Sequence, residues 1–415
     1  MRIYAKTILR FILRVLAKWT LAKYQPGIIG ITGTVGKTST KEAVYTVLRA
    51  IRDVRASIGN FNNEFGLPLA ILGNWQKIPE TSGQRKLFWL KVILASLLRL
   101  IVRVKYPELL ILEYAADRPG DIKYLLEIAR PQIGIITAIG DIPVHVEFYS
   151  GPDEVAREKS RLVEFLPSAG FAILNFDDEA VLDMKDRTRA HIITYGFGQG
   201  AQIQITHLEN RMENNKPAGI VFKLEYGGSF VPVRLNGCFG KAQAYAAATA
   251  AAVGIAFSMN FVKIAEALSY YQAPTSRFKL IPGVKGTFIF DDSYNASPLS
   301  MHAAIETFKS FKDSRRVAVL GDMLEIGKYT IEAHETIGAL AGKIFDILIT
   351  VGARAKFIAE KANDSGLAKK NIFAFETAEE AAPEVQKLIR KGDYVLVKAS
   401  RAIGLDKIVE EIKLI

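Results

Sequence analysis

The segment at residues 33–40, Gly-Thr-Val-Gly-Lys-Thr-Ser-Thr, constrains the fold more than any other part of the chain. An apolar run at residues 27–31 precedes it and predicts a buried strand, and a helical pattern follows it to about residue 49. A glycine-rich turn between a strand and a helix points backbone N–H groups inward, where they bind phosphate oxygens. In such a loop Lys37 is expected to neutralise phosphate charge and Thr38 to ligate Mg²⁺. The segment therefore predicts a nucleotide-binding domain whose phosphate contacts are Gly33, Thr34, Gly36, Lys37, Thr38 and Ser39.

The rest of the chain alternates short apolar segments with helical stretches, which indicates parallel βαβ units. Residues 192–235 instead alternate polar and apolar side chains between glycines, which predicts a small antiparallel patch. A second doubly wound unit begins near residue 274. The expected fold class is α/β: a P-loop ATPase domain with a mostly parallel sheet at residues 26–273, and a smaller Rossmann-like domain at residues 274–415. Further strands are expected at residues 109–113, 133–137, 171–175, 287–290, 316–320, 347–351 and 394–398.

Composition supports a folded globular protein. The 415 residues are 49% hydrophobic and 23% charged, which excludes disordered and collagen-like chains. Cys238 is the single cysteine, so an internal disulfide and a cysteine-based zinc site are excluded and a reducing cytoplasm is expected.

The net charge of +11 is concentrated in two apolar segments, residues 1–25 and residues 77–106. Arg2, Lys6, Arg10, Arg14 and Lys18 recur at every fourth position of the first segment, among large apolar side chains. Neither segment has the roughly 20 uncharged residues that a membrane-spanning helix needs. Two basic amphipathic helices on an anionic membrane surface are one interpretation, and helices packed on the domain with solvated cations are the other. No recognition motif accompanies the charge, so nucleic acid is not an expected partner.

Several further motifs follow the phosphate loop in a fixed order, and together they resemble the Mur ligase superfamily. An Asn-rich segment lies at residues 60–69, a strand ending in Glu113 follows, and a Glu-Lys-Ser run contains Lys159. Residues 291–298 and 321–327 look specifically like the MurF branch of that superfamily, and residues 398–401 resemble its C-terminal Lys-Gly-Ser-Arg.

The resemblance implies an ATP-dependent amide ligase of peptidoglycan precursor synthesis in the cytoplasm. Such a ligase activates a peptide carboxylate as an acyl phosphate and joins it to the amine of D-Ala-D-Ala. The implied cofactors are ATP and two Mg²⁺ ions, and the implied partners are a muramyl-peptide substrate and D-Ala-D-Ala. The resemblance also implies that Lys159 is carbamylated, because an anionic carbamate holds Mg²⁺ where an ammonium would repel it.

The resemblance assigns site residues by their roles. Catalytic roles fall on Lys37, His145, Lys159 and Arg277. The metal ligands would be Thr38, Glu113, His145 and Lys159. Nucleotide contacts would also come from Gln243, Arg277, Asp292 and Asn295. The substrate contacts would be Asn62, Asn63, Asn295, Lys398, Ser400 and Arg401.

The chain departs from the family pattern in two places. About 26 residues precede the phosphate loop, where family members usually carry a UDP-binding domain, so uridine recognition has no visible location. The family's adenine-contacting His-Asn-x-x-Asn run becomes residues 240–246, with Ala246 in place of the second Asn, and Gln243 is the one amide left to meet a base. A related superfamily ligase with another acceptor, such as a lipid-linked one, and a catalytically silent nucleotide-binding scaffold therefore stay open as alternatives.

Overall fold

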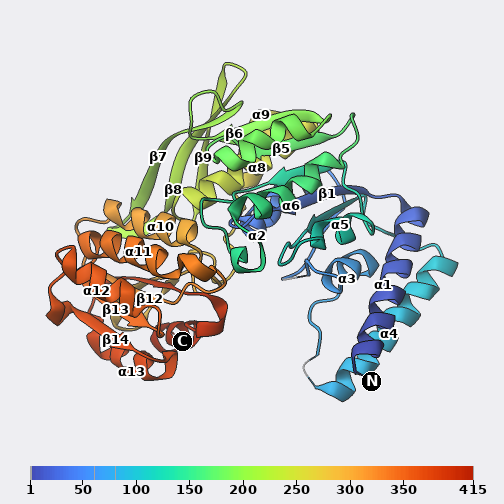
Figure 1. Ribbon diagram of the computed structural model, residues 1–415. Coiled ribbons are helices and arrows are strands. Elements are labelled where there is room, and N and C mark those ends of the chain that lie inside the picture. Colours follow the sequence, from blue (N-terminus) through green and yellow to red (C-terminus); the bar gives the residue numbers. More distant parts are fainter. Residues whose placement is uncertain (1, 60, 80, 415) are drawn as a thin grey trace.

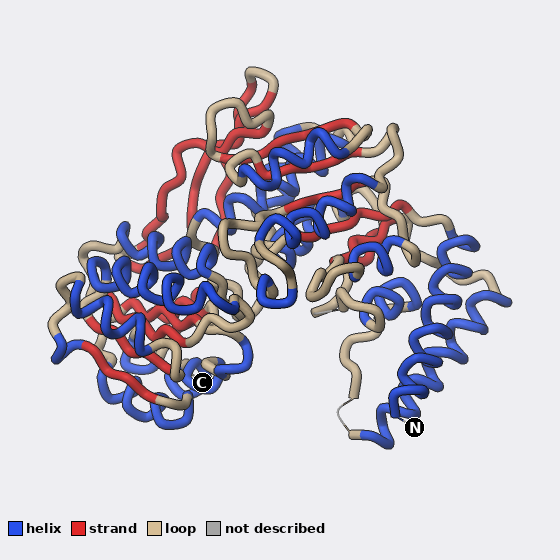
Figure 2. The backbone as a smooth tube through the Cα atoms, in the orientation of Figure 1, coloured by secondary structure: helices blue, strands red, loops and turns tan. Residues whose placement is uncertain are grey.

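The computed structural model describes residues 2–59, 61–79 and 81–414, without the side chains of Arg2, Ile3 and Ser82; Asn60 of the Asn-rich segment lies outside this description. The described chain builds two β-sheets that share no strand, each covered by helices (Figures 1 and 2). The expected α/β class, with a large mostly parallel sheet and a second, smaller sheet, is confirmed. The domain boundaries at residues 25 and 273 stay predictions.

The larger sheet has nine strands in the order β2-β3-β1-β4-β5-β6-β7-β8-β9. The strands from β2 to β7 pair in parallel, and β7, β8 and β9 pair antiparallel. In chain order they are β1 (Gly27–Thr32), β2 (Val54–Ala56), β3 (Leu109–Glu113), β4 (Ile133–Ile136), β5 (Phe171–Asn175), β6 (His191–Gly196), β7 (Ile203–Glu213), β8 (Lys216–Tyr226) and β9 (Ser229–Asn236).

The antiparallel patch expected over residues 192–235 is present in β7 to β9, which continue the same sheet. It does not extend to β6, which pairs in parallel with β5 and β7. The physical reason is a shared core: Ile203, Phe222 and Leu235 bury their side chains in the cluster that also contains Ile29 and Ile31 of β1.

Helices cover both faces of this sheet. Ile29 and Ile31 of β1 face the core under α2 and α8, and Ile28 faces a second core under α3 and α6, so both faces of the strand carry buried apolar side chains. The helices of this part are α1 (Arg2–Tyr24), α2 (Lys37–Leu48), α3 (Gly66–Leu72), α4 (Ser82–Ile101), α5 (Asp121–Leu126), α6 (Pro152–Glu164), α7 (Glu179–Leu182), α8 (Lys241–Ala256) and α9 (Phe261–Leu268).

The second sheet has six strands in the order β10-β11-β15-β12-β13-β14, and β10 alone among them runs antiparallel to its neighbour. Its strands are β10 (Lys279–Pro282), β11 (Phe288–Asp291), β12 (Arg316–Gly321), β13 (Ile347–Val351), β14 (Ile372–Phe375) and β15 (Tyr394–Lys398). Its helices are α10 (Pro298–Thr307), α11 (Thr330–Ile344), α12 (Lys356–Asp364), α13 (Ala378–Leu388) and α14 (Asp406–Ile412).

The two basic segments fold as α1 and α4, which lie side by side at the edge of the molecule away from the second sheet (Figure 1). Their C-terminal ends meet: Lys23 Nζ donates hydrogen bonds to the carbonyls of Arg99 (2.8 Å), Leu100 (3.0 Å) and Val102 (3.3 Å). The two helices therefore run parallel. In the described part of the chain, no helix has the length and apolar character needed to cross a bilayer.

Candidate active site

A cleft of about 710 Å³ opens where the two sheets meet, and the loops that follow their strands line it. Loops at the carboxyl ends of parallel strands are where open α/β sheets bind ligands. The cleft brings together residues that lie hundreds of positions apart in the chain. The expected site residues that line it are Gly33, Thr34, Gly36, Lys37, Thr38, Asn62, Asn63, Glu113, His145, Lys159, Arg277, Asn295, Ser400 and Arg401.

The phosphate loop closes tightly on β4. Gly33 has φ +143°, and a Cβ atom there would stand 2.0 Å from the Thr137 hydroxyl, so only glycine fits. Gly36 has φ +90° and begins α2, whose first N–H groups therefore point toward the cleft. The buried hydroxyl of Thr34 has no hydrogen-bond partner among the described residues. The N–H groups of Thr34 and Val35 donate to the Ala138 carbonyl, so the donors available to a phosphate are the Thr34 hydroxyl and the N–H groups that begin α2.

The side chain of Lys37 folds back over this loop. Its Nζ donates to the carbonyl of Gly33 at 2.6 Å, and the carbonyl of Thr34 lies 3.4 Å away. Burial lowers the pKa of Lys37, the nearby Arg277 lowers it further, and Glu113 opposes both. The anionic groups of the protein therefore do not fully offset the cost of burying this ammonium. A bound phosphate would supply the missing negative charge.

Glu113 ends β3 with its carboxylate buried beneath the cleft. Lys41 Nζ lies 3.0 Å from Glu113 Oε1, and the lysine side chain is closed off from solvent. The oxygen accepts no well-aligned hydrogen bond from any described residue. Glu113 therefore has one cation close by, and its Oε1 can still accept a hydrogen bond or bind a metal ion.

His145 stands between two carboxylates from different parts of the chain. Its Nε2 lies 3.3 Å from Asp117 Oδ1, and its Nδ1 lies 2.8 Å from Glu325 Oε2. Burial lowers the pKa of His145 to about 4. The nearby charge of Asp117 raises this pKa, and the positive charges of Lys159 and Lys37 lower it further. The imidazole is therefore neutral at pH 7, the form that binds metal ions.

Lys159 lies on α6 with its side chain buried against the cleft. Burial and the like charge of Lys37 lower its pKa to about 7, against the pull of Asp117 and Glu158. A large fraction of this amine is therefore uncharged at neutral pH, and an uncharged amine is the nucleophilic form.

Arg277 lies on the segment that connects the two sheets, between two residues in left-handed conformation, Ser276 (φ 56°) and Phe278 (φ 55°). Its guanidinium stacks 3.9 Å from the Tyr294 ring centroid, and one nitrogen lies 3.5 Å from the Thr38 hydroxyl. Strained backbone of this kind is held in place by its surroundings and concentrates at functional sites. The connecting segment thus directs a cation at the start of α2.

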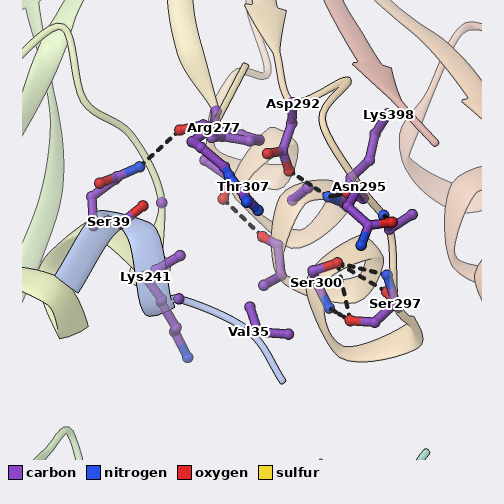
Figure 3. A pocket seen from close by; sticks show the side chains of 18 of the residues that line it. Val35, Ser39, Lys241, Arg277, Asp292, Asn295, Ser297, Ser300, Thr307 and Lys398 are labelled. Carbon is purple, nitrogen blue, oxygen red and sulfur yellow. Dashed lines mark hydrogen bonds and ion pairs between the residues drawn. The ribbon is translucent and has the colours of Figure 1, made fainter. Parts of the chain in front are cut away.

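Asp292, Asn295 and Lys398 meet beside Arg277, in a smaller pocket of about 90 Å³ (Figure 3). Lys398 Nζ lies 2.6 Å from Asp292 Oδ2 and donates to the Asn295 carbonyl at 2.9 Å. Lys398 is almost fully buried and lines this pocket, and it is not among the residues that line the large cleft. Its ammonium is occupied by the protein, so a contact with substrate carboxylate would require these bonds to rearrange.

The remaining substrate candidates do line the large cleft. Asn63 Oδ1 accepts hydrogen bonds from the backbone of Phe65 (3.2 Å) and Gly66 (2.9 Å) and so fixes the start of α3. The Ser400 hydroxyl accepts from the Leu324 backbone at 2.9 Å. Arg401 is exposed, and one nitrogen donates to the Tyr294 hydroxyl at 3.0 Å.

Gln243 is buried, and both ends of its amide are used by the protein. Its Nε2 donates to the Arg277 carbonyl at 2.9 Å, and its Oε1 accepts from the Tyr271 hydroxyl at 2.6 Å. Like Ser39, Gln243 lines the 90 Å³ pocket. The structure therefore uses this amide to hold the segment that carries Arg277, and a base could meet it only by displacing these bonds.

A third cavity, of about 740 Å³, lies on the other side of the phosphate loop. Val35 and Gly36 of the loop line it together with residues of β5, α8 and α10, among them Asn175, Lys241 and His302. The loop therefore separates two large spaces, one beside Glu113 and Lys159 and one beside α8.

The sequence interpretation missed Lys41, Asp117, Tyr294 and Glu325 as site residues. Lys41 had a usable signal: it follows Lys37 by four positions on one helix, so both side chains share a face of α2. The contacts of Asp117 and Glu325 with His145 join loops about thirty and one hundred and eighty residues apart, as only the structure reveals.

Two family models match the chain. The model described as Mur ligase middle domain matches residues 31–78 and 93–254, and the model described as Mur ligase, glutamate ligase domain, matches residues 276–401. Residues 79–92, which include the first half of α4, fall between the two matched stretches of the middle-domain model.

The curated relatives and solved structures agree with these matches. The UDP-N-acetylmuramoyl-tripeptide–D-alanyl-D-alanine ligase of Mycobacterium leprae is 30% identical over 427 residues, covering 95% of this chain and 75% of that protein. MurF from Acinetobacter baumannii superposes with a TM-score of 0.79 at 24% identity, covering 97% of this chain and 80% of that one. MurF ligase from Thermotoga maritima, solved in complex with ADP, gives 0.77 at 25% identity, covering 97% and 83%.

Proposed function

The chain belongs to the Mur ligase family, and we propose that it joins D-alanyl-D-alanine to a muramyl tripeptide in peptidoglycan precursor synthesis. It is an ATP-dependent ligase of the MurF type. The proposal depends mainly on the composition of the cleft. The phosphate loop, Lys159 and Arg277 all line this one cleft, which lies between the two sheets.

The reaction has two steps. A carboxylate oxygen of the peptide attacks the γ-phosphorus of ATP, the bond to the bridging oxygen breaks, and ADP leaves. The amine of the dipeptide then attacks the acyl carbon, phosphate leaves, and the nitrogen loses a proton to give the amide. Phosphoryl transfer depends mainly on positioning and on cancelling phosphate charge, and Lys37 and Arg277 supply cations from two sides of the cleft.

Mg²⁺ is the implied cofactor, and when bound it supplies the remaining charge cancellation at the phosphate oxygens. The residues fit such an ion. Glu113 Oε1 is a buried carboxylate oxygen without an aligned donor among the described residues, and His145 is held neutral. Among those residues no three His, Cys, Asp or Glu side chains cluster closely enough to hold a metal by themselves. We therefore propose that the Thr38 hydroxyl and a carbamate on Lys159 complete the ligand sets with Glu113 and His145.

Carbamylation of Lys159 is supported by its environment. CO₂ reacts with an uncharged amine, forming an N–C bond and releasing a proton, and burial brings the pKa of Lys159 to about 7. The carbamate fraction should therefore rise as pH increases through 7. Protein equilibrated with ¹³C-bicarbonate should give one carbamate NMR signal that Lys159→Ala removes; a signal that persists in this variant contradicts the assignment.

The nucleoside of ATP is proposed to lie in the 740 Å³ cavity beside α8. The γ-phosphate must face Glu113 and Lys159 on one side of the phosphate loop, so the base extends to the other side, where this cavity lies. Lys241 and Asn175 line it, whereas the Gln243 amide is occupied. These side chains are the candidates for contacts that replace the family's second Asn.

Phosphate release with a panel of acceptors tests the function. We expect turnover that requires both a muramyl tripeptide and D-Ala-D-Ala, and that Lys37→Met abolishes. Turnover with a lipid-linked muramyl peptide and not with the soluble one would favour the alternative acceptor. Tight ATP binding without turnover on any acceptor would favour a silent scaffold.

The enzyme is proposed to act in the cytoplasm, where ATP is available, in peripheral contact with the inner face of the membrane. The contact is supported by large apolar side chains that α1 and α4 expose among cations.

A further inference from the structure

α1 exposes an apolar stripe that belongs to none of the cores formed by the described residues. Tyr4 is 78% exposed, Ile8 60%, Phe11 66% and Trp19 56%. Their spacing places them on one face of the helix. Leu13, Leu16 and Ala17 lie on a different face and are buried in the core under α3. The helix is therefore packed through one apolar face and presents a second one to solvent.

α4 repeats this arrangement. Its buried positions are Val92 and Ser96, whereas leucines three or four positions apart lie on the opposite face of the helix. The exposed members of that stripe are Leu87, Leu90, Leu94, Leu97, Leu98 and Ile101, of which Ile101 is 82% exposed. Two neighbouring helices thus expose large apolar stripes, and contiguous exposed apolar surface of this size marks an interaction site.

The two helices themselves carry charge of one sign. α1 and α4 contain ten lysines and arginines and no aspartate or glutamate. Lys18 lies beside the stripe on α1, where Arg14 is already paired with Glu127 at 2.7 Å, and Lys86 and Lys91 lie on the two sides of the stripe on α4. An apolar stripe bordered by cations fits a surface that offers anionic groups above an apolar layer.

The family reaction does not account for this surface. α1 precedes the residues matched by the middle-domain model, and residues 79–92 fall in the gap of that match. Leu94, Leu98 and Ile101 lie within the matched residues 93–254, so the family model matches part of this surface, and none of its residues lines the cleft.

We propose that this helix-pair surface, formed by Tyr4, Ile8, Phe11, Trp19, Leu87, Leu90, Leu94, Leu98 and Ile101, binds the interface of an anionic lipid bilayer. The helices lie on the bilayer, since neither qualifies as a membrane span. A second copy of the chain is the poorer occupant, because two such surfaces would bring like charges together. The inference rests on the peripheral contact proposed above and is independent of which acceptor the ligase takes.

The position of the surface places the substrate loop at the membrane. α3 begins three residues after Asn63, which lines the cleft with Asn62, and α1 and α4 both pack on α3. The rings of Phe65 and Trp89 lie 6.2 Å apart, which joins this loop to α4. An enzyme bound through the helix pair therefore holds the wall of its substrate cleft close to the bilayer.

Co-sedimentation of the full chain with vesicles tests the surface. We expect binding to phosphatidylcholine vesicles that contain phosphatidylglycerol and little binding to pure phosphatidylcholine. The double variant Phe11→Asn/Leu94→Asn should partition on the order of tenfold more weakly, and so should Lys18→Gln/Lys91→Gln, because each cation near an anionic surface contributes to binding. These side chains are exposed, so the variants should fold.

Two controls make the result specific. Phe230→Asn removes an equally exposed phenylalanine (61%) from β9, far from the helix pair in the chain, and should bind vesicles like the unsubstituted protein. Bound vesicles should shift the tryptophan emission to shorter wavelength, and Trp19→Phe should remove most of that shift, because Trp19 alone of the three tryptophans has an exposed ring.

Equal binding to neutral and anionic vesicles, no binding to either, or an equal loss in Phe230→Asn would overturn the proposal. Concentration-dependent dimerisation abolished by Phe11→Asn/Leu94→Asn would instead make a second copy the occupant. Ligase turnover on soluble substrates without vesicles should be the same in all these variants, so failure of the surface and failure of the proposed reaction are read separately.

Discussion

The ammonium of Lys41 lies 3.0 Å from a carboxylate oxygen of Glu113, and both side chains are closed off from solvent. The same ammonium is 3.5 Å from the carbonyl of Gly59. This pair joins the helix that follows the phosphate loop to the end of β3, directly beneath the cleft. The ion pair lies in the floor of the site, and its carboxylate, that of Glu113, is a proposed metal ligand.

Lys41→Met should damage both stability and activity. Methionine keeps the length of the side chain but leaves the Glu113 carboxylate buried without its cation, and breaking a buried pair by removing one partner costs about 3–5 kcal/mol. Urea unfolding measures the loss, and the Mg²⁺ dependence of turnover should change as well. Lys263→Met, at an exposed position of α9, serves as the control and should be neutral. An unfolding midpoint equal to that of the parent would contradict the structural role of the pair.

Gly33→Ala should distort the phosphate loop. The new Cβ would stand 2.0 Å from the Thr137 hydroxyl at a φ of +143°, so the loop must shift at a cost of about 1–3 kcal/mol and its donors lose their alignment. We expect ATP affinity, measured by calorimetry, to fall on the order of ten- to a hundredfold. Gly151→Ala, where the backbone is extended and no atom lies within 4 Å of the added group, should bind ATP normally. Retained affinity in Gly33→Ala would mean that ATP binds elsewhere.

Arg277→Lys should lower kcat on the order of a hundredfold while the protein remains folded. Lysine keeps the charge but loses the planar group that stacks on Tyr294 and reaches Thr38, so the cation is no longer held at the start of α2. Arg130→Lys changes a comparable guanidinium, 5.6 Å over Phe165, at a site remote from the cleft and should leave kcat unchanged. A kcat within twofold of the parent for Arg277→Lys would remove Arg277 from the reaction.

His145 should make stability depend on pH in the acid range. Its folded pKa is about 4 against an ordinary value of 6.5, so the unfolded chain takes up the proton first. The stabilisation is fully present above pH 6.5 and is lost as pH falls from 6.5 toward 4. Unfolding free energies measured across this range should show a positive slope that His145→Gln reduces. His191→Gln, an exposed position at the start of β6, should leave the slope unchanged.

The strands and the phosphate loop could be predicted because their signals are local. β1, β3 and β4 are short runs that are apolar up to their last residue, and the glycines at 33 and 36 are required by backbone geometry. The extension of the large sheet through β7 to β9 could not be predicted. Alternating polar and apolar residues indicate a strand, but they do not indicate which other strand it pairs with.

The residues that the motifs pointed to come together in one place, whereas contacts that join distant loops were not foreseen. Lys37, Glu113, Lys159 and Arg277 all line the cleft as expected. Lys398 and Gln243 also lie at the site, but both are buried and bonded to the protein, and a sequence motif carries no information on whether a polar group is already satisfied. Whether they contact ligand stays a prediction.

The parallel course of α1 and α4 has an electrostatic consequence. Each helix carries a partial negative charge at its C-terminal end, and parallel packing brings two such ends together, which is unfavourable where antiparallel neighbours would attract. Lys23 stands at that junction with three carbonyls of the other helix around its ammonium. One cation, four positions before the phosphate-loop strand begins, thus offsets the negative charge that gathers where the two helices end.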